Sequence, residues 1–133
     1  MVGIERSSFG EESYRREMIE RLLTEKGFNS VLAEEGEEKA GYATFHEDAR
    51  RKRARIITIA VIPKYRNRGL AREMLAFLDQ EMIRSGTRTA SLEVGVSNVP
   101  AIDLYLSVGY RIRGTIPDYY GEGKGAFYME KSF

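Results

Sequence analysis

The stretch Ile59-Ala60-Val61-Ile62-Pro63-Lys64-Tyr65-Arg66-Asn67-Arg68-Gly69-Leu70-Ala71 decides the fold of this 133-residue chain. Its β-branched apolar run predicts a strand that stops at Pro63, and an amphipathic helix begins near Gly69. Unpartnered N–H groups and the dipole of a helix start stabilise a phosphate, and a glycine lets the anion approach the main chain. The stretch therefore predicts a strand, a turn and a phosphate cradle, although helix starts flanked by arginines are also common surface features.

The stretch also resembles the acetyl-CoA signature of the GNAT acyltransferases. The similarity lies in a strand followed by Val-x-Pro-x-Tyr-Arg and Arg-x-x-Gly-x-Ala, with Ala71 at the position of the usual second glycine. The resemblance implies that the pyrophosphate of acetyl-CoA is held by Arg66, Asn67, Arg68, Gly69, Leu70, Ala71 and Arg72. It also implies that the main chain of Ile59, Ala60 and Val61 bonds the pantetheine arm and polarises the thioester carbonyl.

A second segment, Ser91 to Tyr110, resembles the Leu-Glu-Val…Asn…Ala-Ile…Leu-Tyr…Gly-Phe/Tyr pattern of the RimI-type N-terminal acetyltransferases within the same family. Glu93 lies in an apolar strand, where a carboxylate is costly unless it is paired, solvated or used. Without the resemblance, an outward-facing strand residue is the simpler interpretation. The resemblance implies that Glu93 is the general base for the substrate amine. A modest base suffices for an α-amine, whose pKa is about 7.7 to 8.0, whereas that of lysine is about 10.4.

Two further residues of this segment are candidates. From helical spacing alone Tyr105 is a core tyrosine, and the resemblance implies instead that its hydroxyl protonates the departing coenzyme sulfur. Asn98 is expected to cap the helix that follows it, and by similarity it also contacts the coenzyme. Tyr119 and Tyr120, on a glycine-containing loop, border the substrate mouth by similarity; they could instead brace the hairpin around them.

Composition narrows the function classes. The chain has no cysteine and one histidine, His46, which argues against a catalytic zinc site, and we expect no metal. The formal net charge is +1, so neither a nucleic acid nor a membrane is expected as a partner. No apolar run approaches membrane-spanning length and no signal peptide is visible, so a cytoplasmic protein is expected. The block Arg50 to Arg55 is interpreted as a solvated loop, with ribosomal RNA or the coenzyme 3′-phosphate as less favoured partners.

Periodicity then orders the elements along one domain, residues 1–133. Helices are expected at roughly 11 to 26, from about 68 to Gly86, and from Asn98 to Gly109. Strands are expected at Asn29 to Ala33, Ala40 to Phe45, Arg55 to Ile62, Thr89 to Val96, Tyr110 to Ile116 and Ala126 to Lys131. This is an α/β arrangement, and the resemblance makes it a GNAT fold with a mixed, mostly antiparallel sheet flanked by helices. The first strand of that fold is expected to be missing or short.

These expectations lead to one functional hypothesis with alternatives. The chain is expected to transfer acetyl from acetyl-CoA to the α-amine of a protein N-terminus by direct attack, with Glu93 as base and Tyr105 as acid. A ribosomal protein is one candidate source of that N-terminus. Acetylation of lysine side chains or of small-molecule amines stays open, and so does a non-catalytic acyl-CoA-binding module. The chain is expected to act as a monomer or a homodimer.

Overall fold

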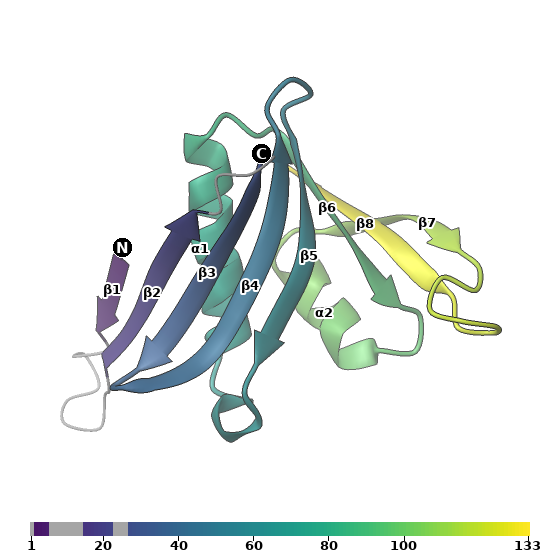
Figure 1. Ribbon diagram of the computed structural model, residues 1–133. Coiled ribbons are helices and arrows are strands. Elements are labelled where there is room, and N and C mark those ends of the chain that lie inside the picture. Colours follow the sequence, from purple (N-terminus) through teal and green to yellow (C-terminus); the bar gives the residue numbers. More distant parts are fainter. Residues whose placement is uncertain (1, 6–14, 23–26) are drawn as a thin grey trace.

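The computed structural model describes residues 2–5, 15–22 and 27–133, which form one eight-stranded sheet and two α-helices (Figure 1). The helices are α1 (Leu70–Arg84) and α2 (Val99–Ser107). The strands are β1 (Val2–Glu5), β2 (Arg15–Leu22), β3 (Phe28–Glu35), β4 (Glu38–Asp48), β5 (Arg53–Val61), β6 (Thr89–Gly95), β7 (Arg111–Ile116) and β8 (Ala126–Ser132). A short 3-10 helix, Pro63–Tyr65, follows β5.

The sheet is mixed and mostly antiparallel, as the sequence predicts. Its strand order is β1-β2-β3-β4-β5-β6-β8-β7, and only the β5–β6 pair is parallel. Helix α1 makes the crossover between the parallel strands, and α2 connects β6 to β7, which lies beyond β8. Both crossover helices were expected at these places. The first strand is short, as expected, because β1 has four residues.

The predicted helix at 11 to 26 is wrong where the structure describes it. Residues 15–22 form β2, whose main chain pairs with β3 from Arg16↔Glu35 to Leu22↔Asn29; residues 11–14 and 23–26 lie outside the described residues. The expected helix rested on Tyr14, Met18, Ile19, Leu22 and Leu23, which recur at helical spacing, and on Gly27 as its stop. Such a pattern is typical of a helix but is also compatible with a strand that has apolar residues on both faces. Pairing with a neighbouring strand decides the outcome here.

The core lies between the sheet and the helix that crosses it. Along β3 the burial alternates, so that Val31 and Ala33 are buried while Ser30 and Leu32 are more accessible. Helix α1 packs on β4 and β5 and buries Leu70, Met74, Leu75, Phe77, Leu78 and Met82. Gly41 of β4 permits this approach, because a Cβ there would lie 2.8 Å from the Ala60 oxygen and 3.1 Å from the Met74 sulfur.

The feature that positions the site is the separation of two neighbouring strands. β5 and β6 are paired only at Arg53↔Thr89, Ala54↔Ala90 and Arg55↔Ser91. Beyond Arg55 the strand β5 continues along β4, while β6 continues along β8, so the two strands diverge (Figure 1). Beyond Arg55, the main-chain N–H and C=O groups of each strand that face the other strand therefore form no β5–β6 ladder.

Candidate active site

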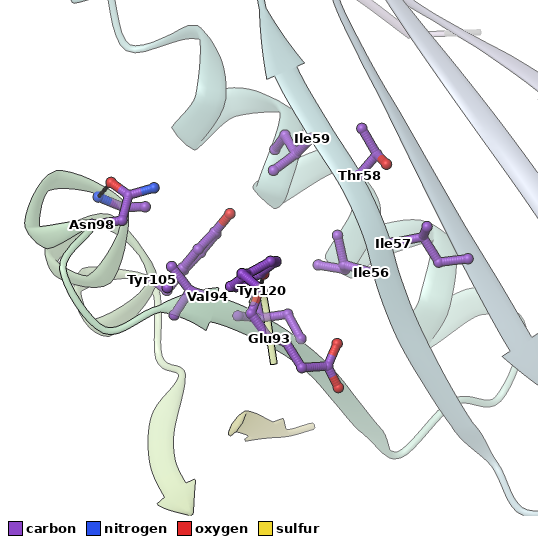
Figure 2. Close-up of a pocket in the computed structure, with 12 residues that line it drawn as sticks. Ile56, Ile57, Thr58, Ile59, Glu93, Val94, Asn98, Tyr105 and Tyr120 are labelled. Carbon is purple, nitrogen blue, oxygen red and sulfur yellow. Dashed lines mark hydrogen bonds between the residues drawn. The ribbon is translucent and has the colours of Figure 1, made fainter. Parts of the chain in front are cut away.

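A pocket of about 450 Å³ opens where β5 and β6 diverge (Figure 2). It is bounded by β5, β6, the start of α2 and the loop before β8. Its lining residues are Ile56, Ile57, Thr58, Ile59, Leu92, Glu93, Val94, Gly95, Asn98, Ala101, Tyr105 and Tyr120. The pocket thus brings together four residues that were separate candidates in the sequence: Glu93, Asn98, Tyr105 and Tyr120.

Glu93 lines this pocket and is bound by an arginine. Its side chain is 12% exposed, and its Oε1 accepts a hydrogen bond of 3.0 Å from Nε of Arg55. The second carboxylate oxygen has no hydrogen bond from another described residue. Figure 2 shows the carboxylate directed from β6 toward β5. A carboxylate with one oxygen anchored and the other available can accept a proton from a ligand in the pocket.

Tyr105 projects into the same pocket from α2. Its side chain is buried, and Figure 2 shows the hydroxyl directed toward Ile59 of β5. Burial raises the pKa of the Tyr105 hydroxyl, and the nearby Tyr120 raises it further. The phenol therefore remains protonated at neutral pH and can donate a hydrogen bond into the gap between the strands.

Asn98 caps α2, as its sequence position predicts. Its Oδ1 accepts a hydrogen bond of 3.4 Å from the main-chain N–H of Ala101, and Pro100 occupies the first turn, where a missing N–H costs nothing. Both Asn98 and Ala101 line the pocket. The cap thus fixes one wall of the pocket.

The two loop tyrosines differ in what they contact. Their rings meet edge to face, with centroids 4.8 Å apart. Tyr120 lines the pocket and donates a hydrogen bond of 3.4 Å to the main-chain oxygen of Glu93, whereas the hydroxyl of Tyr119 accepts one of 3.0 Å from Nη2 of Arg55. The loop is also tied internally, because the Asp118 carboxylate accepts a hydrogen bond of 2.6 Å from the Gly123 N–H. It therefore forms a defined rim.

The hydrogen bonds of β5 show which main-chain groups of Ile59, Ala60 and Val61 face β4 and which face the gap between β5 and β6. The N–H of Ile62 donates to the Ala40 oxygen on β4 over 2.8 Å. Since main-chain groups alternate in direction along a strand, those of Ala60, paired with Tyr42, also face β4. The main-chain groups of Ile59 and Val61 consequently face the gap. Of these groups, the Val61 oxygen already accepts a hydrogen bond of 3.1 Å from Nε of Arg66.

A second pocket, of about 590 Å³, lies at the start of α1. Its lining residues are Val61, Tyr65, Arg66, Asn67, Gly69, Leu70, Ala71, Arg72 and Leu104. The two pockets are lined by neighbouring positions of the same two elements, Ile59 and Val61 on β5 and Ala101 and Leu104 on α2. One pocket lies at a helix N-terminus with arginines and the other contains the Glu93 carboxylate.

The turn before α1 needs unusual backbone geometry. Asn67 has φ 65° and Gly69, the residue before α1, has φ 79°. Both values lie in the left-handed region that asparagine and glycine tolerate. A Cβ at Gly69 would meet no atom within 4 Å, so the side toward which it would point is open. This openness suits close approach of an anion to the first N–H groups of α1.

The side chain of Arg68 is directed away from this second pocket. It does not line the second pocket; its Nη1 lies 3.7 Å from Oε2 of the buried Glu35, and its guanidinium stacks over the Tyr65 ring at 5.5 Å. The basic side chains that line this pocket are those of Arg66 and Arg72. Of the nominated cradle residues, Arg68 is thus the one whose side chain the structure directs away from the pocket.

Sequence reasoning missed Arg55. It treated the block Arg50 to Arg55 as a solvated loop leading into the strand expected from Arg55, whereas the turn ends at Lys52 and β5 begins at Arg53. Alternation along the strand did not point from Ile59 to Arg55, because an irregularity at Ile57 shifts the register between Ile56 and Thr58. The contact with Glu93, 38 residues away, leaves no local trace.

The described residues hold neither a metal-binding cluster nor a membrane-spanning helix. No group of three or more His, Cys, Asp and Glu side chains within 2–5, 15–22 and 27–133 could hold a metal ion. In the same part of the chain, neither helix has the length and apolar character needed to cross a membrane.

Comparison with known families gives a match over most of the chain. Residues 2–110 match the model of the acetyltransferase (GNAT) family. The matched region contains both diverging strands, the turn before α1, Glu93 and Tyr105.

Curated relatives match over a shorter region. The [ribosomal protein bS18]-alanine N-acetyltransferase of Escherichia coli strain K12 is 40% identical over 67 residues, which are 50% of this chain and 45% of that protein. An N-alpha-acetyltransferase of Sulfurisphaera tokodaii is 33% identical over 79 residues, 59% of this chain and 47% of that protein. The chain spans about half the length of the curated relatives it matches.

Solved structures agree with the fold. The ribosomal-protein-S18-alanine N-acetyltransferase of Escherichia coli superposes with a TM-score of 0.74 at 28% identity, covering 81% of this chain and 70% of that one. A GNAT family acetyltransferase of Elizabethkingia anophelis with acetyl-CoA bound gives a TM-score of 0.79, covering 89% of this chain and 98% of that one. Its identity is 14%, so it supports the fold alone.

Proposed function

The chain belongs to the acetyltransferase (GNAT) family, and from this premise we propose that it transfers the acetyl group of acetyl-CoA to the α-amine of a protein N-terminus. The observation that carries the proposal is the pocket between the diverging strands, where Glu93 and Tyr105 face one space. The α-amine as acceptor is supported by the curated relatives, whose names describe N-alpha and ribosomal-protein alanine N-acetyltransferases. The proposal takes residues 1–133 as one acetyltransferase domain.

The two adjoining pockets fit an elongated, anionic thioester such as acetyl-CoA. In the proposal its phosphates lie at the start of α1, held by Arg66, Asn67, Gly69, Leu70, Ala71 and Arg72. Arg68 belongs to this cradle by its place in the turn, although its guanidinium lies at Glu35. When bound, acetyl-CoA supplies an activated acetyl thioester. The main chains of Ile59 and Val61, with Ala60 between them, and the cap residue Asn98 line its approach to Glu93.

Glu93 prepares the acceptor in this mechanism. An ammonium cannot attack a carbonyl, so one proton must leave the nitrogen before the new C–N bond forms. Glu93 accepts that proton, directly or through water, at the oxygen that Arg55 does not bind. The α-amine has a pKa of about 7.7 to 8.0, so much of it is already neutral near pH 8 and the demand on the carboxylate is modest.

Tyr105 acts at the other end of the reaction. As the C–N bond forms, the C–S bond breaks and the electron pair goes to sulfur, whose conjugate thiol has a pKa of about 8.5. The raised pKa of Tyr105 makes it a weaker acid than that thiol. Tyr105 therefore stabilises the developing thiolate by hydrogen-bond donation and keeps its own proton. The nitrogen loses its second proton as the amide forms, and the thiolate gains one from solvent, so that the products are the amide and the free thiol.

The acceptor approaches past the loop that carries Tyr119 and Tyr120. Both side chains are substantially exposed, at 40% and 53%, and Tyr120 lines the pocket itself. Aromatic rings at a rim offer contact area to a peptide main chain. A ribosomal protein is one candidate source of the N-terminus, and a cytoplasmic location is part of the proposal for that reason.

Mass-spectrometric mapping of the acetylated position tests this function. The acceptor is a short peptide with a free α-amine and one internal lysine, and a second peptide has the same sequence with a blocked N-terminus. Acetyl on the α-amine of the first peptide and none on the second is the expected result. Acetyl-lysine in both peptides would instead identify a lysine acetyltransferase.

Two controls make a negative result informative. Calorimetry with acetyl-CoA shows whether the coenzyme binds, and a panel of small amines shows whether the acceptor class is wrong. Binding without transfer to any peptide or amine would contradict the proposed enzyme and favour a non-catalytic acyl-CoA-binding module. Size-exclusion chromatography with light scattering distinguishes a monomer from a homodimer under the same conditions.

A further inference from the structure

Arg55 occupies a place that the proposed reaction does not use. It is the last β5 residue paired with β6, directly at the point where the strands diverge. Its Nε donates to Glu93 and its Nη2 donates to the hydroxyl of Tyr119, each over 3.0 Å. One guanidinium therefore touches both the candidate base and the rim of the acceptor site.

This guanidinium is only partly engaged. An arginine carries five N–H donors in a planar fork, and the two hydrogen bonds above use one each. The side chain is 49% exposed. Partial burial lowers the pKa of Arg55, but the hydrogen bond and charge of Glu93 outweigh it and hold that pKa above its ordinary value. A permanent cation with spare donors thus lies between Glu93 and the loop tyrosine Tyr119.

The positive charge of Arg55 beside Glu93 affects how an amine acceptor can bind. An N-terminal ammonium that approaches Glu93 competes with Arg55 for the same carboxylate and brings a second positive charge beside the first. Like charges this close repel each other, and the partly desolvated site screens them less than bulk water does. A second negative group on the acceptor removes the difficulty, because Arg55 can move its pairing to that group while Glu93 pairs with the ammonium.

We propose that Arg55 is a specificity-determining residue that selects acceptor N-termini whose first residue is Asp or Glu. The inference rests on the proposed function. In the free protein Arg55 pairs with Glu93, and with the acceptor bound two ion pairs replace one: Arg55 with the acceptor carboxylate, and Glu93 with its ammonium. Guanidinium and carboxylate match in a bidentate geometry, which favours this exchange over simple displacement.

Arg53 provides the matched control. It lies two residues earlier on the same strand face, and it also forms an ion pair, with Nη2 2.5 Å from Oε2 of Glu130. Its Nη2 also donates to the hydroxyl of Tyr128 over 3.1 Å. Neither Arg53 nor Arg55 lines either of the two pockets, but Arg55 alone of the two bonds Glu93. A substitution of Arg53 changes the charge of the chain equally without removing a hydrogen bond to Glu93.

The experiment measures steady-state acetylation of four peptides that differ only in the first residue: Asp, Asn, Ala and Lys. All internal amines are blocked, and kcat and KM are determined separately for the wild-type chain, Arg55→Gln, Arg55→Lys and Arg53→Gln. The Asp and Asn peptides have nearly the same shape, so their ratio isolates the charge. Circular dichroism confirms that each variant is folded at the assay temperature.

We expect the wild-type chain to prefer Asp to Asn by about tenfold in kcat/KM, mainly through KM, because one charge-assisted hydrogen-bonded pair is at stake. In Arg55→Gln this ratio falls to about one, Arg55→Lys retains part of it, and Arg53→Gln keeps the wild-type ratio. A purely structural role of Arg55 would change all four peptides alike and leave the ratio intact.

Three results would overturn the inference, and they differ in what else they refute. Equal acetylation of the Asp and Asn peptides by the wild-type chain, or a ratio that survives in Arg55→Gln, would refute selection by Arg55 while leaving the proposed function standing. Transfer to free aspartate and to none of the peptides would refute the proposed function as well, since the acceptor would then be a small molecule.

Discussion

Arg68 Nη1 lies 3.7 Å from Oε2 of Glu35, whose side chain is only 5% exposed. One arginine of the coenzyme signature is therefore directed toward the sheet, while Arg72, one turn of chain later, lines the pocket at the start of α1. The same motif thus contains an arginine placed to support the turn and an arginine placed to meet an anion. The division can be tested, because the two roles predict that the same substitution lowers mainly coenzyme affinity at Arg72 and mainly folding stability at Arg68.

We expect Arg72→Gln to weaken binding of coenzyme A about tenfold, since it removes a cation from the anion pocket. Arg68→Gln should weaken binding less and instead lower the free energy of unfolding by about 1 kcal/mol, because its partner Glu35 is buried while Arg68 itself is partly screened by solvent. Titration calorimetry and urea unfolding measure the two quantities. Equal loss of affinity in both variants would contradict this division.

Tyr105→Phe should lower kcat about a hundredfold while leaving the dissociation constant of coenzyme A nearly unchanged, because the hydroxyl acts on sulfur only as charge develops there. The matched control is Tyr110→Phe. That ring lies 6.1 Å from Tyr105 but does not line the pocket. Full turnover by Tyr105→Phe would remove the proposed role of the hydroxyl.

Local signals predicted helix α1 but not strand β2. Helix α1 has apolar residues at Leu70, Met74, Leu75, Leu78 and Met82, and Gly86 follows its last residue closely, so its face and its end were expected. The segment of β2 carries the same kind of apolar pattern, so that pattern alone does not separate a strand from a helix. Its identity depends on pairing with β3, and a partner strand cannot be identified from the segment alone.

The candidate site also contains residues that the sequence predicted and residues that it did not. Asn98 and Gly69 carry local signals, a helix cap and a left-handed turn, and the structure has both features. The bond between Arg55 and Glu93 has no local signal, because it joins residues on strands that are paired only near that point. The direction of Arg68 likewise depends on Glu35, which is distant in sequence. Side-chain partners across the sheet therefore required the structure.

Tyr110 makes a prediction about stability. Its side chain is fully buried, and its hydroxyl has no hydrogen-bond partner among the described residues. Burial raises the pKa of this hydroxyl strongly, so it stays protonated. Removing a buried polar group that gains no hydrogen bond avoids its desolvation cost, so Tyr110→Phe should be neutral or stabilising by up to about 1 kcal/mol. Urea unfolding measures the change; a loss above about 1 kcal/mol would mean that the hydroxyl has a partner.

Glu130 makes a prediction about acid stability. The Arg53 hydrogen bond, with a second from Tyr128, holds the pKa of the Glu130 carboxyl below its ordinary value. A lowered pKa in the folded state contributes stability above the unfolded value, about 4.3, and that contribution disappears as the pH falls through the folded value. The Tm of Glu130→Gln should therefore fall less between pH 7 and pH 3 than the wild-type Tm. Parallel curves would show that the pairing contributes nothing.

Glu93→Gln tests the base through the pH dependence of the rate. The variant cannot accept a proton, so it must rely on acceptor molecules that are already neutral. Their share falls as the pH drops below the α-amine pKa of about 7.7 to 8.0. The ratio of wild-type to variant kcat/KM should therefore be large near pH 6.5 and shrink toward pH 9. A constant ratio across this range would show that Glu93 binds or orients the acceptor without taking its proton, because a positioning role does not follow the titration of the amine.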